Sequence, residues 1–161
     1  MIDMMAGAFP EMVCCREQKM KCGSLIATLL LASLANAELR PLLDSIREVE
    51  SGGNADLVGD GGRSLGPYQI QWAYWKDAGL PGAYQQVRNP RYAERVMIAY
   101  WKRYCPGALA RRDYQTLARV HNGGATGIRK AATLPYWRKV SNELRERKAL
   151  PAQSDSTRRR R

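Results

Sequence analysis

The chain has few cysteines, one histidine and no long apolar run, and each shortage excludes a class of protein. Three of its four cysteines lie within the first 22 residues, so the rest of the chain holds only Cys105 and cannot form an internal disulfide. One histidine and one cysteine are too few ligands for a metal site, and we expect neither a metal nor another cofactor. No apolar run reaches the roughly 18 residues of a membrane span, which excludes a polytopic membrane protein.

What is present fits one globular domain. The chain has 161 residues, of which 45% are apolar and 25% charged, enough for one core but not for two. The formal net charge of +11 attracts polyanions, namely nucleic acid, anionic lipid or a bacterial wall polymer. The basic residues are scattered and form no groove-reading motif, so we expect no nucleic-acid partner.

The N-terminal segment has the layout of a secretory signal peptide. Lys21 precedes an apolar stretch at 23–34, and an Ala-x-Ala pattern follows at 35–37. A buried core helix is the alternative for the apolar stretch. We expect Met20 to be the true start, residues 1–37 to comprise an upstream extension and the signal peptide, and the protein to be secreted, either outside the cell or into a periplasm. No cysteine follows the cleavage site, so we expect no stable membrane anchor.

The spacing of apolar residues predicts a mostly helical α+β domain over residues 38–148. Helical periods occur at 38–50, 72–78, 90–104, 113–121 and 135–148. Residues 54–66, together with Gly53, hold five glycines, which predicts turns or a small hairpin, and an extended piece follows at 67–71. We therefore expect four or five helices with a small β-hairpin after the first helix. Polar and basic residues dominate the end of the chain, and we expect a basic, disordered tail at 149–161.

Glu50 lies on the core-facing side of the first predicted helix. On a helical wheel it falls within the apolar stripe of that helix, whereas Glu48 falls on the opposite side. A carboxyl group that faces the core at the end of a helix sits at the wall of a cleft. Desolvation there favours the protonated form, as a general acid requires. The alternative is a frayed last turn in which Glu50 swings out into solvent.

Asp60 follows within the glycine-rich segment, between Gly59 and Gly61. Its open surroundings predict that this carboxylate stays ionised. Glycoside hydrolysis uses one carboxyl group to protonate the leaving oxygen and a second to attack or stabilise the oxocarbenium-like centre. A turn residue that binds local backbone amides is the alternative for Asp60, and Asp56 is a rival for the same role.

Five short motifs resemble those of the invertebrate-type lysozymes, the destabilase group. In family order they are V-E-S-G-G at 49–53, D-G-G-R-S-L-G-P-Y-Q-I at 60–70, Y-W-K-D at 74–77, A-R-V-H-N-G-G at 118–124 and Y-W-R-K-V at 136–140. The resemblance covers about residues 38–142. It implies a lysozyme-like fold and hydrolysis of the β-1,4 bond between N-acetylmuramic acid and N-acetylglucosamine in bacterial peptidoglycan. It further implies that Glu50 is the proton donor and Asp60 the second catalytic carboxylate.

The chain departs from the family pattern in two respects. Family members are usually dense in disulfides, whereas the predicted mature chain has one cysteine. Some members also carry an isopeptidase activity, attributed to a serine with a lysine or a histidine. Ser64 and His121 are possible counterparts, but no matching lysine follows Glu50, so we do not expect that activity.

Six further residues are candidates to line a sugar cleft, because aromatic faces stack on pyranose rings and amides bind N-acetyl groups. They are Tyr68, Gln69, Tyr74, His121, Asn122 and Gly123. For the aromatic residues a place in the core is the alternative, which we expect for Trp75, Trp101 and Trp137.

Two other functions remain open. A lytic transglycosylase would use Glu50 alone, because the 6-hydroxyl group of the sugar replaces the second carboxylate. A non-catalytic cationic wall binder would rely on the net charge instead. The leading hypothesis is a secreted, monomeric peptidoglycan hydrolase.

Overall fold

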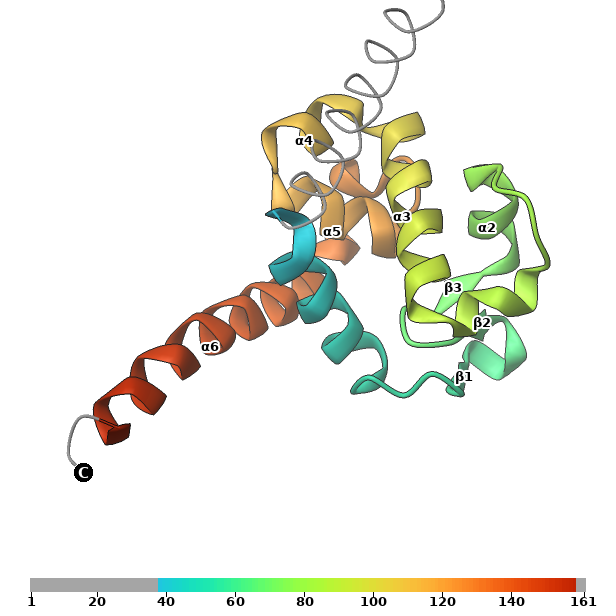
Figure 1. Cartoon of the computed structure of the whole chain (residues 1–161). Coiled ribbons are helices and arrows are strands. Elements are labelled where there is room, and N and C mark those ends of the chain that lie inside the picture. The colour runs from blue at the N-terminus through green and yellow to red at the C-terminus, as the bar shows by residue number, and fades with distance from the viewer. Residues whose placement is uncertain (1–37, 159–161) are drawn as a thin grey trace, which may run out of the picture. The chain divides into compact units, whose positions relative to one another are not determined.

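The computed structural model describes residues 38–158, with side chains placed through residue 149 (Figure 1). The predicted signal segment, residues 1–37, and the last three arginines lie outside the described residues. From Leu39 onward the chain forms one unit. Within the described part, no helix is both long and apolar enough to cross a lipid bilayer.

Six α-helices, four short 3-10 helices and a small sheet make up this part of the chain. The α-helices are the first helix (residues 38–51), α2 (Trp72–Ala78), α3 (Pro90–Tyr104), α4 (Pro106–Arg111), α5 (Tyr114–Gly123) and α6 (Leu134–Arg158). The 3-10 helices are η1 (Asp60–Gly62), η2 (Tyr84–Arg88), η3 (Gly127–Arg129) and η4 (Ala131–Thr133). The strands are β1 (Val58–Gly59), β2 (Ser64–Leu65) and β3 (Ile70–Gln71).

The α+β class is confirmed, but the number of helices is six rather than four or five. The additional helix is α4, which Pro106 begins after the backbone leaves the helical region at Cys105 (φ −147°, ψ 53°). Six residues are too few to show a helical period in the sequence. The last helix also extends to Arg158, past Lys148, where the sequence predicted its end.

Polar caps and a glycine set the helix ends at the positions that the sequence predicts. The Asn89 side chain accepts hydrogen bonds from the backbone amides of Arg91 and Tyr92 at the start of α3. Asp113 accepts one from the Thr116 amide at the start of α5 (3.1 Å). Gly79 ends α2 in the left-handed conformation, at φ 69°.

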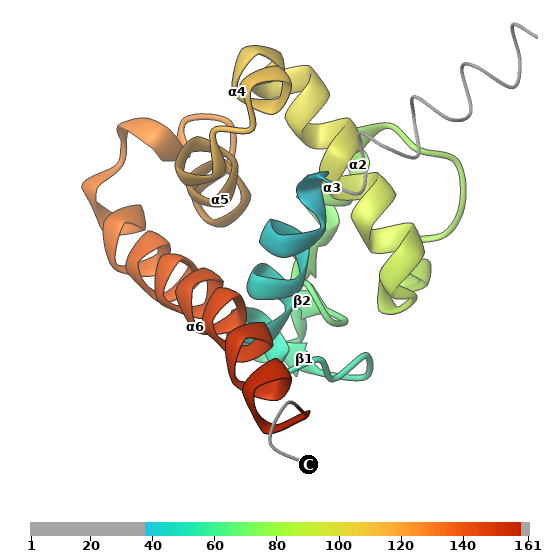
Figure 2. The same cartoon turned by 60° about the vertical axis from the view of Figure 1, so that its left-hand side comes forward.

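The first helix lies between α3 and α6 (Figure 2). Its apolar stripe is buried at Leu39, Leu42, Leu43 and Ile46. Ion pairs fasten it on both sides, from Arg40 to Glu94 of α3 and from Glu48 to Arg147 of α6. This packing fixes the direction in which the end of the first helix, and with it Glu50, points.

The three strands form an antiparallel sheet in the order β1-β2-β3. Gly59 pairs with Ser64, and Ser64 pairs with Gln71. The turn from β1 to β2 passes through positive φ angles at Asp60 (50°) and Gly61 (63°), which explains the glycine-rich sequence. The register therefore places Ser64 of β2 and Gln71 of β3 beside the Asp60 turn.

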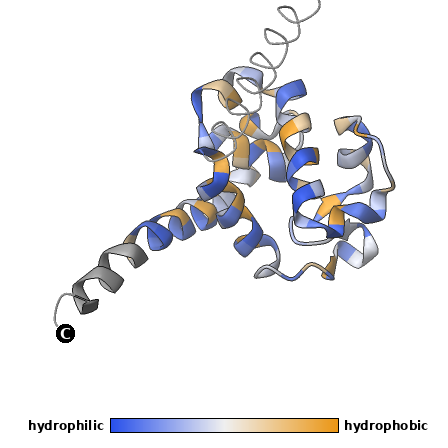
Figure 3. Cartoon of the chain, viewed as in Figure 1, coloured by the Kyte–Doolittle hydropathy of each residue, from blue (hydrophilic) through white to orange (hydrophobic). Residues whose placement is uncertain are grey.

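Most of the core comes from apolar faces of the helices, joined by Tyr68 and by Ile70 of β3, and Trp101 is its largest fully buried side chain. The Trp101 indole N–H donates to the Leu117 carbonyl group (3.0 Å), which couples α3 to α5. Trp75 and Trp137 pack against this core, as the sequence predicts. Apolar and hydrophilic residues alternate along α3, which has an apolar and a polar face (Figure 3).

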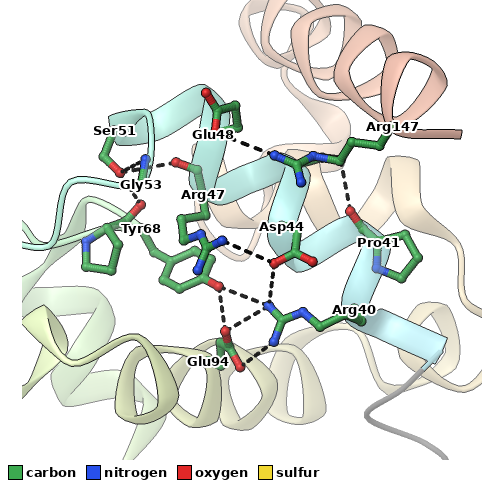
Figure 4. A network of polar contacts seen from close by, with 12 residues as sticks. Arg40, Pro41, Asp44, Arg47, Glu48, Ser51, Gly53, Tyr68, Glu94 and Arg147 are labelled. Atoms are coloured by element: carbon green, nitrogen blue, oxygen red, sulfur yellow. Dashed lines mark hydrogen bonds and ion pairs between the residues drawn. The ribbon is translucent and has the colours of Figure 1, made fainter. Parts of the chain in front are cut away.

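A polar network joins the first helix to α3 (Figure 4). Arg40 binds both carboxylate oxygens of Glu94 at 3.1 and 2.8 Å, and the Tyr68 hydroxyl donates to Glu94 Oε1 at 2.7 Å. Arg40 also pairs with Asp44, which pairs with Arg47. Burial alone would raise the pKa of Glu94, but the hydrogen bonds from Arg40 and Tyr68 hold it below its ordinary value of 4.5.

Replacing Glu94 by glutamine should lower the free energy of unfolding at neutral pH by about 1–3 kcal/mol, because two donors lose a charged acceptor. A carboxylate with a lowered folded-state pKa stabilises the fold above its unfolded pKa, and this contribution is lost as the pH falls through the folded value. The deficit of E94Q should therefore shrink on acidification below 4.5. Urea denaturation in neutral and acidic buffer measures the difference in free energy of unfolding between E94Q and wild type. Glu146→Gln, at an exposed position, is the control. Equal stabilities of E94Q and wild type at neutral pH would contradict this assignment.

Candidate active site

A cleft of about 590 Å³ brings together most of the residues singled out from the sequence. Its walls come from the end of the first helix, the sheet, α2, α3, the end of α5 and the loop that follows α5. Seven predicted site residues line it, namely Glu50, Asp60, Gln69, Tyr74, His121, Asn122 and Gly123.

Glu50 lies in the cleft wall and does not swing out into solvent. Its side chain is 18% exposed, and the helix continues through Ser51 without fraying. The Ser51 hydroxyl donates to the Pro67 carbonyl group (2.9 Å) and accepts from the Gly53 amide (3.1 Å). Ser51 therefore fastens the end of the helix to the segment that leads into β3.

His121 lies next to Glu50 in the cleft wall. The His121 ring is buried near the end of α5, with Nε2 3.5 Å from Glu50 Oε1 and 3.2 Å from the Tyr68 carbonyl oxygen. The Tyr68 carbonyl oxygen can only accept a hydrogen bond, which assigns the ring proton to Nε2. His121 thus places an N–H beside the Glu50 carboxyl group.

Tyr136 of α6 covers the same carboxyl group from another side. Burial, followed by the negative charge of nearby Glu50, raises the pKa of Tyr136 well above its ordinary value. Its buried hydroxyl makes no hydrogen bond of standard geometry. The surroundings of Glu50 are therefore aromatic and largely closed to water.

Asp60 lies in different surroundings in the same cleft. Its side chain is exposed, and Oδ2 accepts hydrogen bonds from the Ser64 hydroxyl (2.6 Å) and from the Gln71 amide (3.2 Å). These bonds, the one from Ser64 above all, lower the pKa of Asp60 below its ordinary value of 3.8. The partners are side chains on β2 and β3 rather than local backbone amides, so the turn holds an ionised carboxylate at the cleft.

Asp56, the rival for the role of second carboxylate, does not line the cleft. Its side chain is 91% exposed and lies 3.8 Å from Arg88. The geometry therefore favours Asp60.

Tyr68 was predicted to line the sugar cleft, and this prediction is wrong. Its side chain is fully buried, and its hydroxyl points to Glu94 in the network described above. Only its backbone carbonyl group faces the site, through His121. The position directly after the glycine loop suggested exposure, but the ring instead fills the core.

Gln69 and Tyr74 line the cleft and are both held by contacts within the protein. The Gln69 amide donates to the carbonyl groups of Leu57 (3.2 Å) and Gly66 (2.8 Å). The Tyr74 ring stacks on Tyr100 at a centroid distance of 3.7 Å. Both residues shape the cleft more than they offer free groups to a ligand.

Several residues that line the cleft were not predicted to bind a ligand. They are Ser64, Gln71, Asp77, Tyr100 and Lys130. Ser64 had been considered for an isopeptidase activity, but its hydroxyl is buried and donates to Asp60. The roles of Ser64 and Gln71 follow from strand register, for which two-residue strands leave no periodic signal in the sequence.

Comparisons with known proteins identify the family of the chain. The sequence model of the Destabilase family matches residues 41–143. A lysozyme from Magallana gigas is 38% identical over 82 residues, which cover 50% of this chain and 60% of that protein. An invertebrate-type lysozyme from Ruditapes philippinarum is 33% identical over 95 residues, which cover 56% of this chain and 70% of that protein. The chain thus spans less than two thirds of the Magallana gigas lysozyme.

Solved structures give the same result for the fold. The inhibitor-bound lysozyme from Meretrix lusoria has a TM-score of 0.55 and 32% identity, covering 63% of this chain and 87% of that chain. The Tapes japonica lysozyme has a TM-score of 0.54 and 31% identity, covering 62% of this chain and 85% of that chain. Since the family match alone covers more than half of its residues, the chain belongs to the destabilase family of invertebrate-type lysozymes.

Proposed function

We propose that the protein is a peptidoglycan hydrolase that cleaves the β-1,4 bond between N-acetylmuramic acid and N-acetylglucosamine. One observation carries the proposal: Glu50 and Asp60 line the same cleft in unlike surroundings. Glu50 is largely covered, whereas Asp60 is exposed and held ionised by two hydrogen bonds. The names of the relatives, which include several lysozymes, support the same activity.

In this mechanism Glu50 acts as the general acid. It gives its proton to the glycosidic oxygen as the bond to the anomeric carbon breaks, so the leaving sugar departs as an alcohol. The ionised Asp60 faces the positive charge that develops on the anomeric carbon, and it stabilises or attacks that centre. Water then adds to the anomeric carbon and gives its proton back to Glu50, which completes the hydrolysis. The buried His121 ring packs against Glu50, with Nε2 3.5 Å from Oε1, and limits the positions that its carboxyl group can take.

Hydrolysis is favoured over the lytic transglycosylase alternative because of Asp60. A transglycosylase uses a single carboxyl group, so a second carboxylate held in the cleft by Ser64 and Gln71 would have no role in it. The products separate the two reactions. Hydrolysis leaves reducing ends, whereas the transglycosylase leaves 1,6-anhydro ends.

We also propose that the protein is exported and works as a monomer free in solution. The cleft is built from one chain, and the substrate lies outside the cell membrane. Residues 38–148 would form the catalytic domain, and the basic tail at 149–161 would add attraction to the anionic wall.

Replacing Glu50 by glutamine should lower the rate of wall lysis at least about 100-fold, because the variant has no proton to give to the leaving oxygen. Asp60→Asn should also lower it strongly. Mass spectrometry of digests of purified peptidoglycan measures the reducing ends, and thermal unfolding checks that both variants remain folded. Near-normal lysis by E50Q would overturn the proposal, and cell killing without lysis would favour the cationic binder.

Replacing Ser64 by alanine should move the acid limb of the pH profile of kcat/KM to higher pH. Ser64 makes the largest contribution to lowering the pKa of Asp60, so its loss raises that pKa and Asp60 becomes protonated at a less acidic pH. Gln71→Leu should move the limb in the same direction by less, and the exposed Gln85→Leu of η2 serves as the control. An acid limb that stays at the wild-type position in both site variants would show that Asp60 does not control it.

Export should yield a mature protein that begins at Glu38. The Ala-x-Ala pattern at 35–37 is the expected cleavage site. N-terminal sequencing of the secreted protein tests this. Recovery of the full-length chain inside the cell only would contradict it.

A further inference from the structure

Lys130 is the single lysine or arginine among the described residues that line the cleft. The other charged residues there are Glu50, Asp60 and Asp77. Glu50 and Asp60 belong to the proposed reaction, and Asp77 accepts a hydrogen bond from the Tyr104 hydroxyl (3.1 Å). Lys130 has no role in the reaction described above, although it is exposed to the same space.

The Lys130 ammonium group is held at the cleft wall by a single hydrogen bond within the protein. Its Nζ donates to the Gly123 carbonyl group at 2.5 Å, which occupies one of three donors. No carboxylate of the described residues lies within ion-pair distance of it. The remaining donors, and the full positive charge, are available to a ligand.

A buried arginine, Arg119, holds the backbone at Lys130 by hydrogen bonds. Arg119 of α5 donates from Nε to Thr133 Oγ1 (2.9 Å) and from a terminal nitrogen to the Lys130 carbonyl oxygen (3.0 Å). The Thr133 hydroxyl lies within hydrogen-bond distance of the carbonyl groups of Gly127 (2.9 Å) and Lys130 (2.8 Å). A side chain at Gly127 would collide with the Arg119 carbonyl group, so the loop packs directly on the backbone of α5.

This bracing distinguishes Lys130 from an ordinary surface lysine. Burying a guanidinium group is unfavourable unless it is fully hydrogen-bonded, and here the bonds of Arg119 go to the loop that presents Lys130. A fixed ammonium group lowers the entropy lost when a ligand binds.

We infer that Lys130 binds a carboxylate carried by a substituent of the glycan and thereby helps the enzyme to distinguish wall glycan from an uncharged one. The inference rests on the proposed function. Alternate sugars of the wall glycan carry a lactyl ether, and this ether carries a peptide. A free carboxylate is present on the lactyl group when the peptide is absent, and on the peptide when it is attached. An ammonium group pairs with either through a charge-assisted hydrogen bond.

The experiment compares Lys130→Gln with wild type on substrates that differ only in their carboxylates. Glutamine keeps a polar N–H donor at this position while the charge is lost. The substrates are peptide-bearing strands and strands stripped of peptide, each with its carboxylates free or converted into amides. Lys102→Gln, on the exposed side of α3 outside the cleft, controls for the general effect of net charge on wall binding. The rate of release of reducing ends gives kcat/KM for each pair.

K130Q should lower kcat/KM by about three- to tenfold on a substrate with free carboxylates, and the loss should vanish on its amidated form. The strand type that shows the loss identifies the lactyl or the peptide carboxylate as the partner. Equal losses on free and amidated strands, no loss on any substrate, or the same loss for K102Q would overturn the inference. Failure of the wild type to release reducing ends from every substrate would instead overturn the proposed function, and this inference with it.

Discussion

The candidate site depends on the way in which Pro67 and Tyr68 are fastened between the helices. The Pro67 carbonyl group accepts from Ser51 at the end of the first helix, and the Tyr68 carbonyl oxygen lies 3.2 Å from His121 of α5. The Tyr68 hydroxyl reaches the other way and donates to Glu94 of α3. Two residues therefore connect three helices to the sheet, and their burial fixes the distance between the end of the first helix and the Asp60 turn.

This junction explains why two carboxyl groups can share one cleft and yet lie in unlike surroundings. Glu50 comes from a helix that packs into the core, so its side chain emerges among buried His121 and Tyr136. Asp60 comes from a turn of a sheet too small to bury it, and two side chains of the sheet keep it ionised. The chemical difference between the two groups thus follows from the kind of element that carries each.

The sequence predicted the parts of this arrangement that depend on local periodicity and caps. The apolar stripe placed Glu50 on the core side, Asn89 and Asp113 began their helices, and the glycines located the hairpin. The supporting contacts of Asp60 could not be predicted, because they depend on the pairing of Ser64 with Gln71. Tyr68 was misplaced for a similar reason, since only the tertiary packing decides whether an aromatic ring after a turn lies inside or outside. Lys130 lies in a loop of 3-10 helices without a periodic pattern, and its position depends on Arg119, which a sequence pattern does not reveal.

The most direct test of the account is a crystal structure of the Asp60→Asn variant with an uncleaved wall tetrasaccharide bound. The account predicts that the sugar chain lies in the cleft with one glycosidic oxygen within hydrogen-bond distance of Glu50, while the anomeric carbon of the same bond faces residue 60. A tetrasaccharide bound elsewhere, or a glycosidic bond that meets only one of the two residues, would contradict it.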